Sequence, residues 1–297
     1  MLHTEPGLMV LFAIALVAAA VNGALGYGFS SITVPVALLF FSNRLLSPAL
    51  VLIELAVNSW IVYLNRASLS GALRRAMPIV LGLVPGVVLG SALRSGVDPG
   101  WLKLCTYAVL LPFILLQAAG FRRPIRSEAL VAVPLGVGVG TLYATTTISG
   151  PPLALMFNNQ GLDKDHFRGA LGIVRVAETM LTAAAYGWLG LYSSASLRLL
   201  IWIVPAVLMG LPLGAFIVGY VRVETFRRVC MSFDAWIVGF GLARTIIELR
   251  LLAPHAAFTV WYAAIGLDLY LLYRYFLVER ALSRQARDNE YWRIANY

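Results

Sequence analysis

Long apolar blocks separated by short charged gaps are the main pattern along this chain. Two charge-free runs, 6–43 and 129–162, are each long enough for two helices or for one helix and a half-helix. The remaining apolar blocks have the length of about one membrane span each. They are 46–64, 76–93, 104–121, 167–190, 179–197, 199–221, 227–248 and 251–267, the last continuing to residue 277. The pattern predicts an all-α polytopic membrane protein.

The composition changes this picture only by excluding other classes of protein. Of the 297 residues, 60% are hydrophobic and 12% are charged, and the mean hydropathy is +0.81. A soluble domain is about 45–50% apolar and about 25% charged. These values exclude a soluble globular enzyme, a disordered tail and a collagen-like fibre. A chain of this length holds about eight to ten membrane spans with short loops.

The net charge of +9 comes from basic gaps between the apolar blocks, so we expect no nucleic-acid partner. The gaps 94–100 and 188–196 carry no net charge, whereas the basic gaps are 65–75, 121–127, 220–228 and the C-terminal tail. Basic loops remain in the cytoplasm. This places the N-terminus outside and the C-terminus inside the cell inner (plasma) membrane. It also requires the segments 8–41 and 128–158 to return to the side from which they entered.

The first apolar stretch, 8–21, has the length of the hydrophobic part of a signal peptide. The residues before it offer no basic side chain except His3, so a cleaved signal is not favoured. We therefore expect this stretch to be the first helix.

The two long runs are similar to each other, which predicts an internal duplication. Pro35–Phe40 aligns with Pro152–Phe157, and three further pairs follow in the same order. These are Ala49-Leu50 with Ala170-Leu171, Pro78 and Pro85 with Pro205 and Pro212, and Trp101–Cys105 with Phe226–Cys230. Within one transmembrane domain, 1–297, we expect repeat 1 over 8–120, repeat 2 over 128–248, an extra helix over 256–277 and a tail over 278–297. Each repeat has a broken or re-entrant helical hairpin and three transmembrane helices, so the two have inverted topology, as in secondary transporters.

The centres of both runs are rich in glycine, proline and hydroxyl residues, which interrupt a helix. Proline suits the first turn of a helix, so we expect half-helices to begin at Pro35 and Pro151. Their N-terminal ends would attract an anion, and no carboxylate in either run would repel it. Hydroxyls nearby would assist, from Thr33, Thr145, Thr147 and Ser149. The alternative is two helix kinks with small residues for close packing.

Ionisable residues inside spans are the second indication of a site, because each is expensive in a bilayer. Glu54 aligns with Arg175, and Glu178 lies three residues further along the same helix face. A guanidinium matches the geometry of an oxyanion, so Arg175 is the candidate contact, with Glu54 or Glu178 as a titratable partner. The alternative is structural ion pairing. Asp234 has no partner that the sequence identifies.

The sequence gives little support for an ion channel or an enzyme. Gly26-Tyr-Gly28 is similar to part of a potassium filter, but the rest of the TVGYG signature is missing. Common hydrolase motifs are missing as well, and the histidines fall in loops or at the terminus. Cys105 and Cys230 lie inside apolar blocks. We therefore predict no enzyme, no catalytic residue, no metal site and no cofactor.

Specific motifs suggest a family. Ile148-Ser-Gly-Pro-Pro-Leu-Ala-Leu-Met156, followed by Asn159-Gln-Gly161, Phe167-Arg168 and Gly169-Ala-Leu171, resembles the second repeat of the sulfite exporter TauE/SafE family, also called toluene-sulfonate uptake permeases. The stretch ending at Pro35 resembles the first repeat, although Tyr27 and Phe29 interrupt its glycine cluster and Ser30 and Ser31 follow. The resemblance covers most of 8–277. It implies a bacterial or archaeal inner-membrane carrier of sulfite, sulfonates or related organic anions.

We therefore expect a secondary transporter that moves a small sulfur-containing or carboxylate anion by alternating access; the alternative is a non-transporting scaffold or accessory subunit. The sequence leaves open the substrate, the direction of transport, coupling to protons or sodium and the formation of a homo-oligomer. The expected partners are the anion and the lipid bilayer. The candidate substrate-binding residues are Ser30, Ser31, Thr33, Pro35, Thr145, Thr147, Ser149, Gly150, Pro151 and Arg175, and the candidate coupling residues are Glu54 and Glu178.

Overall fold

A computed structural model describes residues 5–64, 66, 69–119, 128–159, 164–220 and 223–279. These residues form helices and connecting turns and contain no strand, which confirms the predicted all-α class. The helices are α1 (Glu5–Leu25), α2 (Phe29–Ala37), α3 (Asn43–Leu64), α4 (Leu69–Gly96), α5 (Pro99–Ala118), α6 (Glu128–Thr146), α7 (Gly150–Asn159), α8 (Lys164–Trp188), α9 (Ser194–Arg198), α10 (Leu200–Tyr220), α11 (Val223–Glu248) and α12 (Pro254–Tyr273), and a π-helical turn (Arg274–Glu279) follows.

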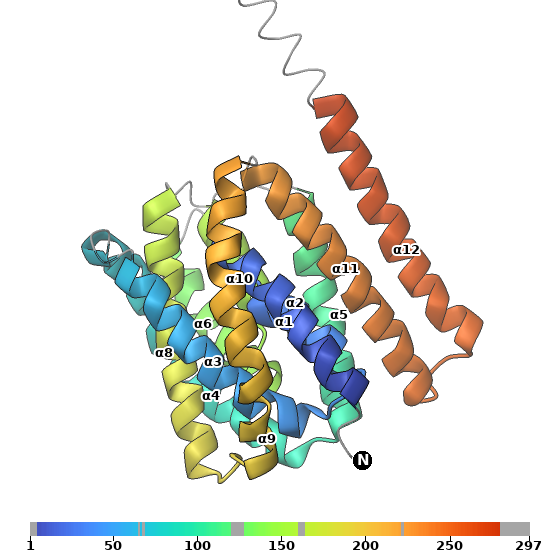
Figure 1. Ribbon diagram of the computed structural model, residues 1–297, viewed down its shortest axis with the longest axis horizontal. Helices are drawn as coiled ribbons and strands as arrows, with labels where there is room; N and C mark the ends of the chain where they lie inside the picture. The colour runs from blue at the N-terminus through green and yellow to red at the C-terminus, as the bar shows by residue number, and fades with distance from the viewer. Residues whose placement is uncertain are drawn as a thin grey trace, which may run out of the picture.

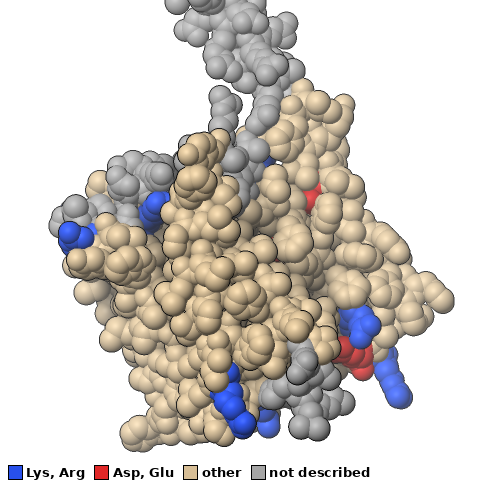
Figure 2. Space-filling model, viewed as in Figure 1, with Lys and Arg blue, Asp and Glu red and all other residues tan. Residues whose placement is uncertain are grey.

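The distribution of apolar side chains is that of a membrane protein. Six described segments are long and apolar enough to cross a bilayer: Pro6–Leu25, Asn43–Leu64, Gly71–Arg94, Ser194–Ile217, Arg228–Glu248 and Pro254–Leu277. Large apolar side chains such as Leu81, Leu208 and Phe216 are exposed, whereas charged side chains such as Arg175 are buried. Figure 2 shows most of the visible charged side chains toward the two ends of the molecule. The chain therefore folds as a polytopic membrane protein whose apolar surface faces lipid.

One expected span is wrong. The apolar block 179–197 is not a single helix, because α8 ends at Trp188 and α9 begins at Ser194. Gly190 adopts a left-handed conformation, with φ of 64°, which ends the helical path. The Ser193 hydroxyl then accepts the backbone N–H of Ser196, and this cap starts the next helix. The turn allows the chain to reverse direction between α8 and α10.

The helices form a bundle in which the short helix α2 lies among longer ones (Figure 1), and the short helix α7 contacts α2, α5 and α8. α4 packs along α6 and α8, α1 packs along α10, and α5 packs along α11. α12 lies at one margin, where it packs mainly on α11. The N-terminus and the start of α3 lie at the lower end in Figure 1, whereas α12 ends at the upper end. α1 and α2 together thus return to the end from which α1 entered.

Small residues allow α4 and α6 to pack backbone against backbone. A Cβ atom on Gly136 of α6 would overlap the carbonyl oxygen of Ile79 on α4. A Cβ on Gly138, two residues further along the same helix, would meet nothing within 4 Å. The contact at Gly136 therefore requires glycine, whereas Gly138 provides a matched control.

We expect Gly136→Ala to lower the stability of the purified protein, because the added methyl group must push two helix backbones apart. Overpacking of this kind costs about 1–3 kcal/mol. The thermal unfolding midpoint in detergent should fall for Gly136→Ala and remain unchanged or rise slightly for Gly138→Ala. Equal midpoints for the two variants would show that α4 and α6 are not held at this distance.

Candidate functional site

Two breaks in the helices form the centre of the site. α1 ends at Leu25 and α2 begins at Phe29, while α6 ends at Thr146 and α7 begins at Gly150. Gly26 and Gly28 have φ angles of 84° and 106°, which glycine adopts readily. Thr147 has a φ of 62°, a conformation that costs a residue with a side chain about 1–2 kcal/mol. Strain of this kind is concentrated at functional sites.

The start of one half-helix differs from the sequence prediction. Pro151 is the second residue of α7, close to the predicted start. Pro35, in contrast, lies inside α2, which begins at Phe29. The reason is that Gly28, in its left-handed conformation, already reverses the chain and serves as the N-cap of α2. Pro35 is therefore not at the N-terminal end of the half-helix, and the prediction for this residue is wrong.

The two half-helix ends differ in the hydrogen-bond donors that they offer. The first intrahelical bonds are donated by Ile32 in α2 and by Leu153 in α7. The N–H groups before these residues have no helical acceptor. In α2 they belong to Phe29, Ser30 and Ser31, whereas in α7 two of the three positions are Pro151 and Pro152, which have no N–H. The end of α2 is thus the stronger donor for an anion.

The two breaks lie against each other. A Cβ placed on Gly150 would be 3.1 Å from Nη1 of Arg175, 3.5 Å from the Tyr27 ring and 3.7 Å from the backbone nitrogen of Gly28. α2 and α7 are also in direct contact. Arg175, from α8, therefore projects its guanidinium group into the junction between the breaks.

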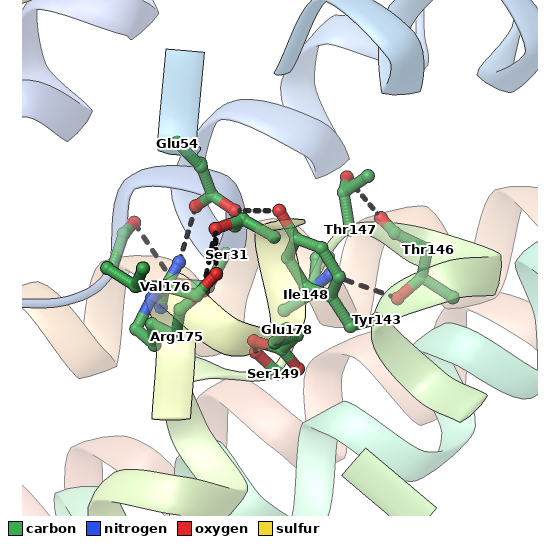
Figure 3. Close-up of polar contacts among 12 residues, drawn as sticks. Ser31, Glu54, Tyr143, Thr146, Thr147, Ile148, Ser149, Arg175, Val176 and Glu178 are labelled. Atoms are coloured by element: carbon green, nitrogen blue, oxygen red, sulfur yellow. Dashed lines mark hydrogen bonds and ion pairs between the residues drawn. The ribbon is translucent and has the colours of Figure 1, made fainter. Parts of the chain in front are cut away.

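Buried charged side chains connect three helices at this junction (Figure 3). Arg175 Nη2 donates to Oε1 of Glu54 at 2.6 Å, and the Tyr143 hydroxyl donates to Oε2 of Glu54 at 2.7 Å. The Ser149 hydroxyl donates to Oε2 of Glu178 at 2.6 Å. Arg175 thus pairs with Glu54 rather than with Glu178 on its own helix. Tyr143 was not among the predicted site residues, and only its place in the polar stretch before the break indicated it.

Some donors and acceptors of this cluster are unused. Within the described part of the chain, Nε of Arg175 and Oε1 of Glu178 have no hydrogen-bond partner. Both of these side chains are buried. Because unpaired buried polar atoms are costly, the arrangement is suited to a further polar group, such as a ligand oxygen and a proton.

The expectation that no nearby carboxylate would repel an anion at the half-helix ends is wrong. Glu54 reaches the junction from α3 and Glu178 from α8, and both lie outside the charge-free runs on which that expectation rests. Asp234 lies on α11, which packs against α2. Asp234 is 0% exposed, neither of its oxygens is hydrogen-bonded within the described residues, and the Ser31 hydroxyl lies within its reach. The site therefore brings two carboxylates, those of Glu54 and Glu178, close to Arg175 and places a third, that of Asp234, near Ser31 of α2.

The predicted hydroxyl residues do not share one cavity. Those of Ser30 and Thr33 are buried and have no partner among the described residues, so they are free for a ligand. Ser31 and Thr147 bond to backbone carbonyl groups, of Gly28 and Thr146. Thr145 donates within α6 and, with Thr146, borders a separate apolar cavity of about 700 Å³. The Thr145 hydroxyl is therefore already bonded within its own helix, unlike those of Ser30 and Thr33.

Comparison with known proteins agrees with this geometry. The family model described as "Sulfite exporter TauE/SafE" matches residues 11–240, which include both breaks, Glu54, Arg175 and Asp234. Neither the curated proteins nor the solved structures gave a match. The match covers most of the chain and ends before α12. The chain therefore belongs to the sulfite exporter TauE/SafE family, whose members are membrane transporters of sulfur-containing anions.

Proposed function

We propose that this protein is a secondary transporter that moves a small sulfur-containing oxyanion, or a related carboxylate, across the inner membrane by alternating access. The observation that carries the proposal is the guanidinium of Arg175 at the junction of the two half-helix breaks. Nη1 of Arg175 faces Gly150, and Nε has no partner in the described structure. Together with the amides that begin α2, these donors can bind pairs of oxygen atoms of an oxyanion.

Alternating access is supported by features that occur twice. The breaks at 26–28 and 147–149 are separated by the same 121 residues as Glu54 and Arg175. α4 packs on α6 as α10 packs on α1, and in each pair a glycine contacts a backbone carbonyl: Gly86 that of Val137, and Gly210 that of Leu16. We infer two inverted repeats, and rocking of such repeats around a central site is a common transport mechanism.

The orientation that we propose has the N-terminus outside and the C-terminus in the cytoplasm. In cells expressing single-cysteine variants, a membrane-impermeant thiol reagent added from outside should label positions in 94–98 and 190–195, which lie at the end of the molecule where α3 begins. It should not label positions in 66–74, of which residue 66 and residues 69–74 are described and lie at the opposite end, or in 284–293, which lie outside the described residues. Labelling of the tail from outside would contradict this orientation.

Transport itself is tested with the purified protein in liposomes. We expect vesicles loaded with unlabelled sulfite to accumulate radiolabelled sulfite by exchange, with chloride as a control anion that does not support exchange. Ethanesulfonate and acetate, tested as competitors, would define the class of anion. Absence of exchange for sulfite, sulfonates and carboxylates alike would favour the alternative, a non-transporting scaffold or accessory subunit.

A further inference from the structure

A second polar cavity lies at the end of the molecule where α3 begins and α4 ends. It has a volume of about 470 Å³ and is separate from the junction of the breaks. Its polar lining comes from three segments: the start of α3, the last turns of α4 and the turn between α8 and α9. The lining residues used below are Ser42, Arg44, Ser91, Arg94 and Ser193.

The charge of this cavity is positive. Arg44 and Arg94 line it, and no Asp or Glu does. Arg44 is exposed and takes part in neither of the ion pairs of the described residues, Lys103–Glu248 and Arg175–Glu54. A pocket with two guanidinium groups and no acid attracts anions, and its walls concentrate the field.

A buried hydroxyl gives independent support for a ligand. Ser91, from α4, is 5% exposed, and its Oγ has no hydrogen-bond partner within the described residues. An unpaired buried hydroxyl loses the hydrogen bonds that it would make with water. An oxyanion in the cavity would supply the missing acceptor, with Ser42 and Ser193 available at the cavity surface.

Arg94 separates this cavity from the helix breaks. Its guanidinium donates to the Asn43 carbonyl at 2.9 Å, to the Thr145 carbonyl at 3.4 Å and to the Tyr186 hydroxyl at 2.8 Å. It also lies 4.8 Å from the centre of the Tyr186 ring. These bonds join α3, α6 and α8, and Thr145 lies immediately before the break at 147–149. Arg94 therefore lies between the cavity, which it lines, and the end of α6 that precedes the break.

We propose that the cavity is an outer binding site for small oxyanions, which holds the transported anion on the outer side of the junction. This inference rests on the proposed transport function. Arg44 and Ser91 bind the anion, and Arg94 is a positioning residue that holds three helices together between the outer site and the break. In the orientation proposed above, the outer site opens to the cell exterior.

Thiol labelling tests the outer site without transport. Ser42→Cys places a thiol in the cavity lining, in a Cys105→Ser background that leaves Cys230 buried as the remaining native thiol. The measured quantity is the rate of reaction with an anionic methanethiosulfonate reagent divided by the rate with a cationic one. We expect this ratio to be about threefold to tenfold higher when Arg44 is present than after Arg44→Gln, because one nearby charge changes local ion concentrations by about that factor. Sodium sulfate should slow labelling in a saturable way, whereas sodium chloride at equal ionic strength should not.

Arg198→Gln is the matched control, since Arg198 is an exposed arginine on the neighbouring α9 that does not line the cavity. Arg44→Gln should abolish protection by sulfate, and Arg198→Gln should preserve it. Equal effects of the two variants, or equal slowing of labelling by chloride and sulfate, would contradict the proposed binding site. Protection by sulfate in a protein that exchanges no anion would refute the transport function and leave the outer site intact.

Transport kinetics test whether the cavity lies on the transport path. In liposomes, Arg44→Gln should raise the KM for sulfite severalfold and leave the maximal rate nearly unchanged, because the affected site precedes the junction. Arg198→Gln should change neither value. An unchanged KM in Arg44→Gln would overturn the role of the cavity as the first site on the path.

Discussion

Arg175→Ala should abolish anion binding and transport. The guanidinium lies between the two breaks and offers the ligand at least one N–H that no described residue accepts. Loss of a buried charged hydrogen-bond partner costs about 2–5 kcal/mol, so we expect affinity to fall about 30-fold or more. Exchange of radiolabelled sulfite in liposomes, together with isothermal titration of the detergent-solubilised protein, measures both effects.

Two further variants distinguish this role from a purely structural one. Arg175→Ala leaves the Glu54 carboxylate buried without its cation, and breaking a buried pair in this way costs about 3–5 kcal/mol of stability. The double variant Glu54→Gln/Arg175→Ala removes both charges, so it should regain stability but still fail to bind the anion. Arg175→Lys should retain a charge and part of the binding. Transport by the stable double variant would show that Arg175 serves only to neutralise Glu54.

Anion binding should strengthen as the pH falls, and Glu178→Gln should remove most of this dependence. Arg175 compensates Glu54, which leaves Glu178 near the junction and Asp234 near Ser31 of α2 as additional carboxylates. Binding an anion beside an ionised buried carboxylate is unfavourable, so each bound anion favours uptake of a proton. When one proton is taken up with the ligand, affinity changes by up to about tenfold per pH unit. Acid conditions therefore strengthen binding.

The measurement compares the affinity of the protein for an anion at several pH values between 6 and 8. A sulfonate is the suitable ligand, because its charge does not change in this range whereas that of sulfite does. Glu178→Gln and Asp234→Asn, which mimic the protonated forms, should each flatten the profile. Glu248→Gln changes a carboxylate that pairs with Lys103 away from the junction, so it should leave the profile intact. A wild-type profile that is flat would exclude proton coupling through these residues.

The helix breaks show what local sequence predicts well. Gly26 and Gly28 interrupt the first helix, and Thr147–Ser149, immediately before the Gly150–Pro152 start of α7, interrupts the second, so both breaks lie at the places expected. Glycine and proline act on the backbone through their own covalent structure. The start of α2 was placed too late, at Pro35, because the glycine-rich turn before it already reverses the chain. A proline permits a helix start, but it does not require one.

The composition of the chain and the lengths of its apolar blocks determined the class of fold and the long apolar helices. They also determined that Glu54, Arg175 and Glu178 lie within spans. Each of these features depends only on residue type and on neighbours along the chain. Tertiary structure alone decided that Arg175 pairs with Glu54, that Asp234 approaches Ser31, that Thr145 faces another cavity and that Arg94 joins three helices. These contacts link residues far apart in the sequence. Their partners depend on how the helices rotate and cross, and a uniformly apolar helix surface does not encode that rotation in its pattern.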